Sequence, residues 1–254
     1  MSTGLVLTVK NLFFPQFCIT CRTRLFTEEN GYFCPTCWES TPRVERPFCP
    51  VCGRPHPPVR GVSSLSNFPC GQCVKRGGTQ PFNRMFAPAV YAEAMAEAIK
   101  LLKFHGKTRL VRPIGELVCD GINQEWDTGG YDFLIPVPLH KVRQRQRGFN
   151  QSLLLANEIV PFFPGARIVE SLRRVRPTLV QSRLKSEAER RENVRGAFEW
   201  CSQAPLTGRK VVLVDDVITT AGTVTECAAV LRSAGARQVD VIAAAIAVAG
   251  PPTE

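Results

Sequence analysis

The spacing of apolar residues along the chain predicts where its helices and strands lie. Between residues 91 and 104, and again between 110 and 117, apolar side chains recur at helical spacing, which predicts two amphipathic helices joined by a turn at Gly106. Farther on, we expect strands at residues 132–138, 167–169, 210–214 and 239–249, and helices at 151–160 and 223–234. Strands that alternate with helices favour an α/β fold with a mostly parallel sheet flanked by helices.

The first 80 residues lack this periodicity and are rich in cysteine, proline and glycine. Eight of the 11 cysteines form four Cys-x-x-Cys pairs, at Cys18/Cys21, Cys34/Cys37, Cys49/Cys52 and Cys70/Cys73. Two such pairs can close a tetrahedron around a zinc ion, with sulfur atoms roughly 2.3 Å from the metal. We therefore expect two structural Zn²⁺ sites, which supply the stability that the few apolar residues of this segment cannot.

Two questions about these cysteines stay open at the level of the sequence. A disulfide framework is the alternative to zinc, but it requires an oxidising compartment, and nothing near the N-terminus directs the chain to one. Twelve residues separate the first two pairs and 17 the last two, so sequential pairing into two sites is the simplest arrangement, with interleaved pairing as the alternative. Cys119, Cys201 and Cys227 stand alone and are expected to be buried small apolar residues.

Polar residues 74–84 are expected to link two parts of the chain, a Cys-rich zinc module at residues 1–80 and the α/β domain at residues 81–254. The longest apolar run, residues 241–249, is too short to cross a bilayer and reads as a buried strand. Lys10 interrupts the apolar residues near the N-terminus, and no small-residue cleavage site follows them. We therefore expect a cytoplasmic protein without membrane insertion.

The positive charge of the chain is concentrated in one segment. The net charge is +10, and residues 141–195 hold 13 Lys and Arg against 5 Asp and Glu. Such a segment suits an anionic partner, either the phosphates of a small molecule or a nucleic-acid backbone, and charge alone does not distinguish them. The simpler alternative is a solvated basic face.

The stretch VVLVDDVITTAGT at residues 211–223 carries the strongest functional signal of the second part. Ligands collect at the carboxyl ends of parallel strands, and this strand presents Asp215 and Asp216, whose carboxylates can accept hydrogen bonds from two ribose hydroxyls. The loop that follows offers backbone N–H groups, hydroxyls and a helix N-terminus to a phosphate monoester, through Thr219, Thr220, Ala221, Gly222 and Thr223. The motif thus suits a 5-phosphoribosyl group. The alternative is a core strand that ends in acids, with Thr223 as a helix cap.

Several motifs in combination make the chain similar to a known family. The strand, acid pair and Thr/Gly-rich loop resemble the type I phosphoribosyltransferases. More narrowly, the chain resembles the ComF family (ComFC- and GntX-like proteins), through its Cys-rich start, LKFHG at 102–106, PVPL at 136–139, RGFNQ at 147–151, RENV at 191–194 before AF at 197–198, and the acid-pair loop. One departure is visible, because the family commonly reads TTGAT where residues 219–223 read TTAGT, so the position of any residue with positive φ is uncertain.

The resemblance implies an N-terminal double zinc ribbon, a type I phosphoribosyltransferase domain, and binding of 5-phosphoribosyl-1-diphosphate with Mg²⁺. It places the diphosphate at the loop after Pro138, with Lys141, Arg143, Arg145, Arg147, Gly148 and Asn150. It matches the basic segment 173–195 to the flexible loop that closes over the substrate, where Gln181, Arg183 and Arg191 would face the site. Guanidinium groups suit this role because they donate to phosphate oxygens in pairs. The implied reaction is displacement of diphosphate at ribose C1, and no residue identifies the acceptor.

The resemblance also implies a role in DNA uptake during natural transformation, with single-stranded DNA and a DNA-uptake helicase as partners. A second hypothesis follows, in which the protein is an accessory that handles single-stranded DNA and keeps the phosphoribosyl site for ligand sensing alone. The zinc module and the basic segments would then contact DNA, with Phe13, Phe14, Phe17, Phe33 and Trp38 as stacking partners. The simpler alternative is that these aromatic side chains pack a small core.

Overall fold

The computed structural model describes residues 15–26, 31–57, 66–77, 80–178, 187–202 and 205–248. Its centre is a parallel sheet with the strand order β3-β10-β9-β5-β6, in which β4 also pairs with β10. The strands are β3 (Arg84–Phe86), β4 (Ala89–Val90), β5 (Phe133–Pro136), β6 (Arg167–Ile168), β9 (Lys210–Ile218) and β10 (Gln238–Ile246). This confirms the predicted α/β class and the parallel sheet.

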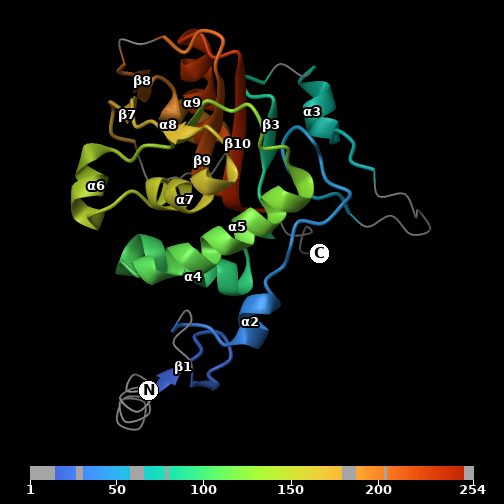
Figure 1. The fold of residues 1–254 in the computed structure, drawn as a ribbon, viewed down its shortest axis with the longest axis vertical. Helices are drawn as coiled ribbons and strands as arrows, with labels where there is room; N and C mark the ends of the chain where they lie inside the picture. Colours follow the sequence, from blue (N-terminus) through green and yellow to red (C-terminus); the bar gives the residue numbers. More distant parts are fainter. Residues whose placement is uncertain are drawn as a thin grey trace.

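Helices cover the sheet, as predicted (Figure 1). They are α4 (Glu93–His105), α5 (Val111–Glu125), α7 (Gln151–Ile159) and α9 (Gly222–Ser233), with the short 3-10 helices η1 (Thr108–Leu110) and η2 (Val160–Phe162). Gly106 ends α4 in the left-handed conformation, with φ 63°, which explains the predicted turn.

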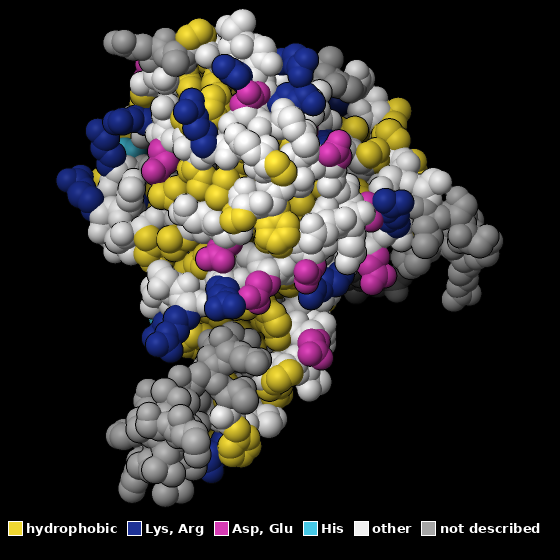
Figure 2. Space-filling view, viewed as in Figure 1, with side chains coloured by type: hydrophobic (Ala, Val, Ile, Leu, Met, Phe, Trp, Pro, Cys, Tyr) yellow, Lys and Arg dark blue, Asp and Glu magenta, His cyan; other side chains and the backbone are white. Residues whose placement is uncertain are grey.

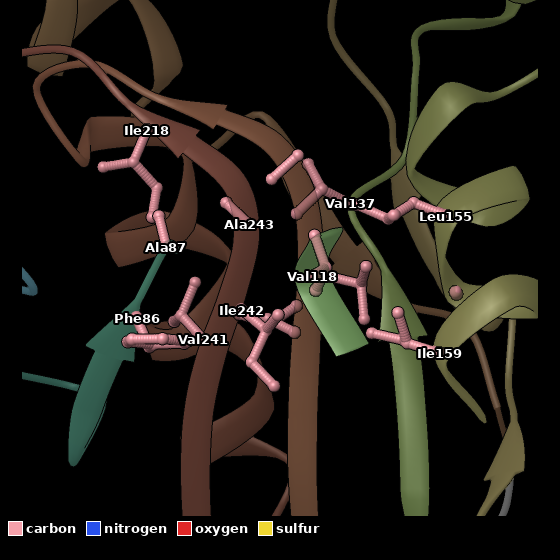
Figure 3. Packing of buried hydrophobic residues seen from close by; sticks show 14 of the residues in the cluster. Phe86, Ala87, Val118, Val137, Leu155, Ile159, Ile218, Val241, Ile242 and Ala243 are labelled. Atoms are coloured by element: carbon pink, nitrogen blue, oxygen red, sulfur yellow. The ribbon is translucent and has the colours of Figure 1, made fainter. Parts of the chain in front are cut away.

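The core forms where α5 and α7 pack on the sheet. Figure 3 shows Val118 of α5 and Ile159 of α7 beside Ile242 of β10 and other buried apolar side chains of the sheet. Strands β9 and β10 lie inside the sheet, and the run Val211 to Val214 is fully buried. A strand buried on both faces needs a continuous apolar run, which is why this sequence pattern located β9 correctly.

The short strands β3 and β4 were not predicted, and three further features differ from the prediction. The basic stretch after β5 forms a short helix, α6 (Lys141–Arg147), for which the sequence predicted no helix. A separate antiparallel ribbon pairs β7 (Leu172–Arg174) with β8 (Phe198–Trp200), and α8 (Glu187–Val194) lies between them in the chain. Strand β9 extends to Ile218, four residues past its predicted end, so that the acid pair lies inside the strand.

The Cys-rich segment contains two small units. We call the unit around Cys18, Cys21, Cys34 and Cys37 the first ribbon, and the unit around Cys49, Cys52, Cys70 and Cys73 the second ribbon. The first contains β1 (Gln16–Phe17), β2 (Arg24–Leu25) and α2 (Pro35–Glu39), and the second contains α3 (Gly71–Lys75). In Figure 1 the first ribbon extends from the lower end of the molecule, whereas α3 lies beside β3.

The segment between the two ribbons is attached to the α/β part. The N–H of Val44 donates to the carbonyl of Pro88 (2.8 Å), and the N–H of Val90 donates to the carbonyl of Pro42 (2.8 Å). Arg46 forms an ion pair with Glu125 of α5, at 2.8 Å between Nη2 and Oε2. In the described part of the chain, no helix has the length and apolar character needed to span a bilayer.

Candidate functional site

The cysteines form two four-sulfur clusters, each with ligand atoms within 4.8 Å of one another. The distance between Sγ atoms is 3.6 Å for Cys21 and Cys34, and 3.7 Å for Cys52 and Cys70. Four sulfurs about 2.3 Å from one zinc ion lie about 3.8 Å apart, so both clusters fit tetrahedral zinc. All eight thiols are free of disulfides. Both clusters are structural zinc sites, and the sequential pairing is the correct one.

The two ribbons repeat the same local geometry. In each, the fourth residue after the first cysteine has a left-handed backbone, with φ 64° at Arg22 and φ 67° at Gly53. The N–H of this residue donates to the carbonyl of that cysteine, at 2.9 Å in the first ribbon and 2.8 Å in the second. The third cysteine of each then precedes a five-residue helix, α2 or α3.

The β9–α9 turn, residues 219–223, joins the end of β9 to the start of α9. Ala221 carries the left-handed conformation, with φ 59° and ψ 3°, at the position where the family pattern has glycine. Gly222 is the first residue of α9. Among the described residues, the buried hydroxyl of Thr220 has no hydrogen-bond partner. The turn therefore brings a helix N-terminus and an unsatisfied hydroxyl to the carboxyl edge of the sheet.

The acid pair lies within β9, and both side chains are buried. Successive residues of a strand point to opposite faces, and the two carboxylates have different partners. Asp215 Oδ1 accepts hydrogen bonds from Ser152 Oγ (3.1 Å) and from the N–H of Asp216 (2.9 Å). Asp216 Oδ2 forms an ion pair with Lys103 Nζ at 2.7 Å. The two adjacent acids thus have a hydroxyl and a cationic partner within the protein itself.

The electrostatics of the pair set its protonation. Burial raises the pKa of Asp215 to about 7, the charge of Asp216 adds to the rise, and Lys103 opposes it. Two carboxylates this close resist ionising together. Asp215 is therefore protonated at a higher pH than an exposed aspartate.

A cavity of about 280 Å³ lies at the carboxyl end of β5, next to β9 in the sheet. Its lining includes Lys141, Arg173 and Arg174, against the single acid Glu170. Burial and Arg143 lower the pKa of Arg174, while the nearby Asp215 opposes this, and its Nε atom has no hydrogen-bond partner among the described residues. The cavity therefore favours an anion, close to the acid pair.

The residues assigned to the diphosphate lie on α6 and just after it. The guanidinium of Arg147 donates to Gln151, and burial lowers its pKa although the charge of Asp216 opposes the shift. Gly148 ends α6 with φ 82°. Arg143 lies on the same helix, and Lys and Arg side chains gather over α6 on the face shown in Figure 2.

Asn150, which the resemblance assigns to the diphosphate site, has a structural role in the fold. Its side-chain oxygen accepts from the N–H of Ser152 (3.0 Å), and its Nδ2 donates to the carbonyl of Val137 (3.1 Å), so it caps α7 and fixes the loop after β5. It also lines the basic cavity. Arg191 belongs to α8, but its side chain lies outside the described residues, as do Gln181 and Arg183.

Three residues of the site had no role assigned from the sequence. Lys103 lies within the LKFHG motif, Ser152 follows RGFNQ, and Arg174 lies in β7. The sequence does not single out Lys103, because Lys100, Lys107 and Glu97 all lie close to it along the chain. Ser152 and Arg174 depend on how α7 and β7 fold against β9, which local sequence does not show.

Comparisons with known proteins agree with this arrangement. The double zinc ribbon domain model matches residues 9–74, and the phosphoribosyl transferase domain model matches residues 155–253. DNA utilization protein YhgH of Shigella flexneri is 33% identical over 230 residues, which cover 89% of this chain and 95% of that protein. Competence protein F of Haemophilus influenzae is 30% identical over 235 residues, which cover 90% of this chain and 96% of that protein.

Among solved structures, a purine phosphoribosyltransferase from Pyrococcus horikoshii aligns with 55% of this chain and 76% of its own, at 13% identity and a TM-score of 0.31, a score too low to bear on the fold. The family assignment rests on the sequence relatives, because their similarity to this chain extends over nearly all of each protein. The chain belongs to the ComF family, with a double zinc ribbon ahead of a phosphoribosyltransferase-type domain.

Proposed function

We propose that this protein binds 5-phosphoribosyl-1-diphosphate with Mg²⁺ at the carboxyl edge of its sheet and acts as a phosphoribosyltransferase. The 5-phosphate lies at the β9–α9 turn, the ribose at Asp215 and Asp216, and the diphosphate beside α6 and the basic cavity. The observation that carries the proposal is the β9–α9 turn itself, a left-handed turn and a helix start with the unsatisfied hydroxyl of Thr220, placed directly after a buried acid pair. Phosphate binding would satisfy these groups.

The proposed reaction needs groups that stabilise the diphosphate as it leaves. The acceptor attacks C1 of the ribose while the bond from C1 to the diphosphate oxygen breaks, so the leaving group gains negative charge. Lys141, Arg173 and Arg174 line the cavity that would hold this charge. Ser152 and Lys103 already engage the two buried carboxylates, so these would not be the main ligands of a magnesium ion. Bound with the diphosphate, magnesium would supply further neutralisation of the leaving group's charge.

Calorimetric titration with 5-phosphoribosyl-1-diphosphate and Mg²⁺ tests the proposal. We expect binding by the wild type, and at least tenfold weaker binding by Asp216→Asn, since ribose hydroxyls lose a charged acceptor. Asp120→Asn removes an exposed acid of α5 and is the matched control, expected to bind like the wild type. Equal affinity of Asp216→Asn and the wild type would contradict the ribose assignment. Release of diphosphate with a panel of nucleobases then tests turnover.

A role in DNA uptake is the second proposed function, and two observations favour it. Relatives are named Competence protein F and DNA utilization protein YhgH, and the basic side chains over α6 form a charged surface. We propose that the protein acts in the cytoplasm on single-stranded DNA, with a DNA-uptake helicase as partner. Affinity for single-stranded DNA that falls steeply with salt would support this role, and affinity independent of salt would contradict it.

A further inference from the structure

The second ribbon lies directly against the β9–α9 turn. A small hollow of about 30 Å³ separates them, lined by Arg54, Gln72 and Arg76 from the ribbon and by Thr219, Thr220 and Ala221 from the turn. Two zinc ligands, Cys52 and Cys73, line the same hollow. Residues about 150 positions apart in the sequence thus meet at the place where a phosphate is proposed to bind.

Close backbone packing holds the second ribbon in this position. A Cβ atom on Gly53 would lie 2.7 Å from the carbonyl oxygen of Met85 in β3, a separation that real Cβ contacts do not show. The ring of Phe48 packs against the ring of Phe86, with centroids 5.9 Å apart. Arg54 follows Gly53 directly, so the same contact fixes where its side chain begins. The arginine therefore belongs to a wall of the hollow whose backbone is held against β3.

The charges around the hollow favour an anion. Two guanidinium groups meet the turn, and none of the described residues that line the hollow is acidic. Arg54 Nη1 donates to Gln72 Oε1 at 3.3 Å, a neutral acceptor that leaves its charge uncompensated. On the other side, the buried Thr220 hydroxyl has no partner. A dianionic phosphate at the turn would compensate the charge of Arg54 and accept from the Thr220 hydroxyl at the same time.

We infer that the second zinc ribbon is a wall of the phosphate subsite, in which Arg54 and Arg76 bind the 5-phosphate together with the β9–α9 turn. This inference rests on the proposed function and adds a specificity for the phosphate at the ribose 5-position. Ligands that carry a phosphate at the ribose 5-position are bound through the ribbon, whereas diphosphate alone, held beside α6, is not. It also makes phosphoribosyl binding depend on an intact second ribbon.

Titrations with three probes test the inference: 5-phosphoribosyl-1-diphosphate, ribose 5-phosphate and inorganic diphosphate, each with Mg²⁺. The variant Arg54→Gln/Arg76→Gln is expected to bind the first two at least tenfold more weakly and to bind inorganic diphosphate like the wild type. Lys75→Gln is the control, because it removes a neighbouring exposed cation of α3 that does not line the hollow. Two zinc ions per chain in every variant show that the ribbons are intact.

The outcomes separate this inference from the proposed function. If the wild type binds neither phosphoribosyl probe, the proposed function is wrong and the inference fails with it. If the wild type binds and the double variant binds equally well, the inference alone is wrong. An equal loss of affinity for the phosphoribosyl probes in Lys75→Gln would also overturn the inference, because any cation near the ribbon would then have the same effect. If the double variant loses zinc, the test uses the single variants Arg54→Gln and Arg76→Gln at full zinc content. The inference then requires that they bind the two phosphoribosyl probes more weakly and inorganic diphosphate like the wild type, and it is wrong if they bind all three like the wild type.

Discussion

The two zinc ribbons have the same ligands and the same local geometry, but they differ in what surrounds them. In the first, Cys21 is exposed, and the contacts with the α/β part include α2 against α4 and Lys107 Nζ 5.9 Å from the centroid of the Tyr32 ring. In the second, Gly53 packs on the backbone of β3, and the ribbon borders the β9–α9 turn. The spacing of cysteines thus determines which residues bind metal, whereas the residues between them determine what the metal site supports.

The largest expected difference comes from removing one ligand of each ribbon. Cys52→Ser is expected to lose one zinc ion per chain, to lower the melting temperature of the α/β part, and to weaken phosphoribosyl binding more than tenfold, because the wall beside the turn unfolds. Cys21→Ser is also expected to lose one zinc ion, but to keep the melting temperature of the α/β part and the affinity for the phosphoribosyl ligand near those of the wild type. Zinc analysis, calorimetric melting and titration check this, and equal effects of the two variants would contradict the comparison.

A subtler change tests the packing rather than the metal. Gly53→Ala places a Cβ against the carbonyl of Met85 and forces a left-handed alanine, so we expect it to lower the free energy of unfolding by about 2–4 kcal/mol. Arg22→Ala changes the equivalent, exposed position of the first ribbon, where a non-glycine residue is already left-handed, and is expected to stay within about 0.5 kcal/mol. Urea unfolding of both variants measures the difference, and a loss of only about 1 kcal/mol in Gly53→Ala, the cost of a left-handed alanine alone, would contradict the packing of the second ribbon on β3.

The strand that ends beside the second ribbon provides the next test, through its buried acid. The pKa of Asp215 is about 7 in the folded chain against an ordinary value of 3.8, so between these values the folded chain holds a proton that the unfolded chain has released. The free energy of unfolding therefore falls as pH rises from about 4 to about 7. Asp215→Asn is expected to remove this fall. Its free energy of unfolding should therefore rise relative to that of the wild type by up to about 1.4 kcal/mol per pH unit.

Urea unfolding at several pH values between 5 and 7 measures the gain. Asp132→Asn is the control. Although burial opposes the shift, the N–H of Lys210 and the guanidinium of Arg209 hold the pKa of Asp132 below its ordinary value, so its titration falls outside this range. A constant difference between Asp215→Asn and the wild type over the same range would show that Asp215 is ionised throughout.

Sequence and structure agree most where a single physical requirement acts on neighbouring residues. The apolar run of β9 could be located because a central strand is buried on both faces, and the zinc ligands because a knuckle needs two thiols at fixed spacing. The partners of the acid pair could not be found this way, since Lys103 and Ser152 reach Asp216 and Asp215 only after α4 and α7 pack on the sheet. The position of the second ribbon beside the turn could not be predicted either, because nothing in the local sequence shows that Gly53 packs against β3.

The smallest expected effect concerns the turn that faces the second ribbon. Ala221 is left-handed where the family pattern has glycine, which costs an L-residue about 1–2 kcal/mol relative to the right-handed region. Ala221→Gly relieves this strain but makes the unfolded chain more flexible, so the net gain in the free energy of unfolding is expected to be about 0.5–1 kcal/mol. Ala229→Gly, within α9, is the matched control and is expected to lose about 1 kcal/mol, because the same change in a helix interior brings only the entropic cost. Urea unfolding measures both, and a loss of stability in both variants would mean that residue 221 does not hold the left-handed turn against which the second ribbon is placed.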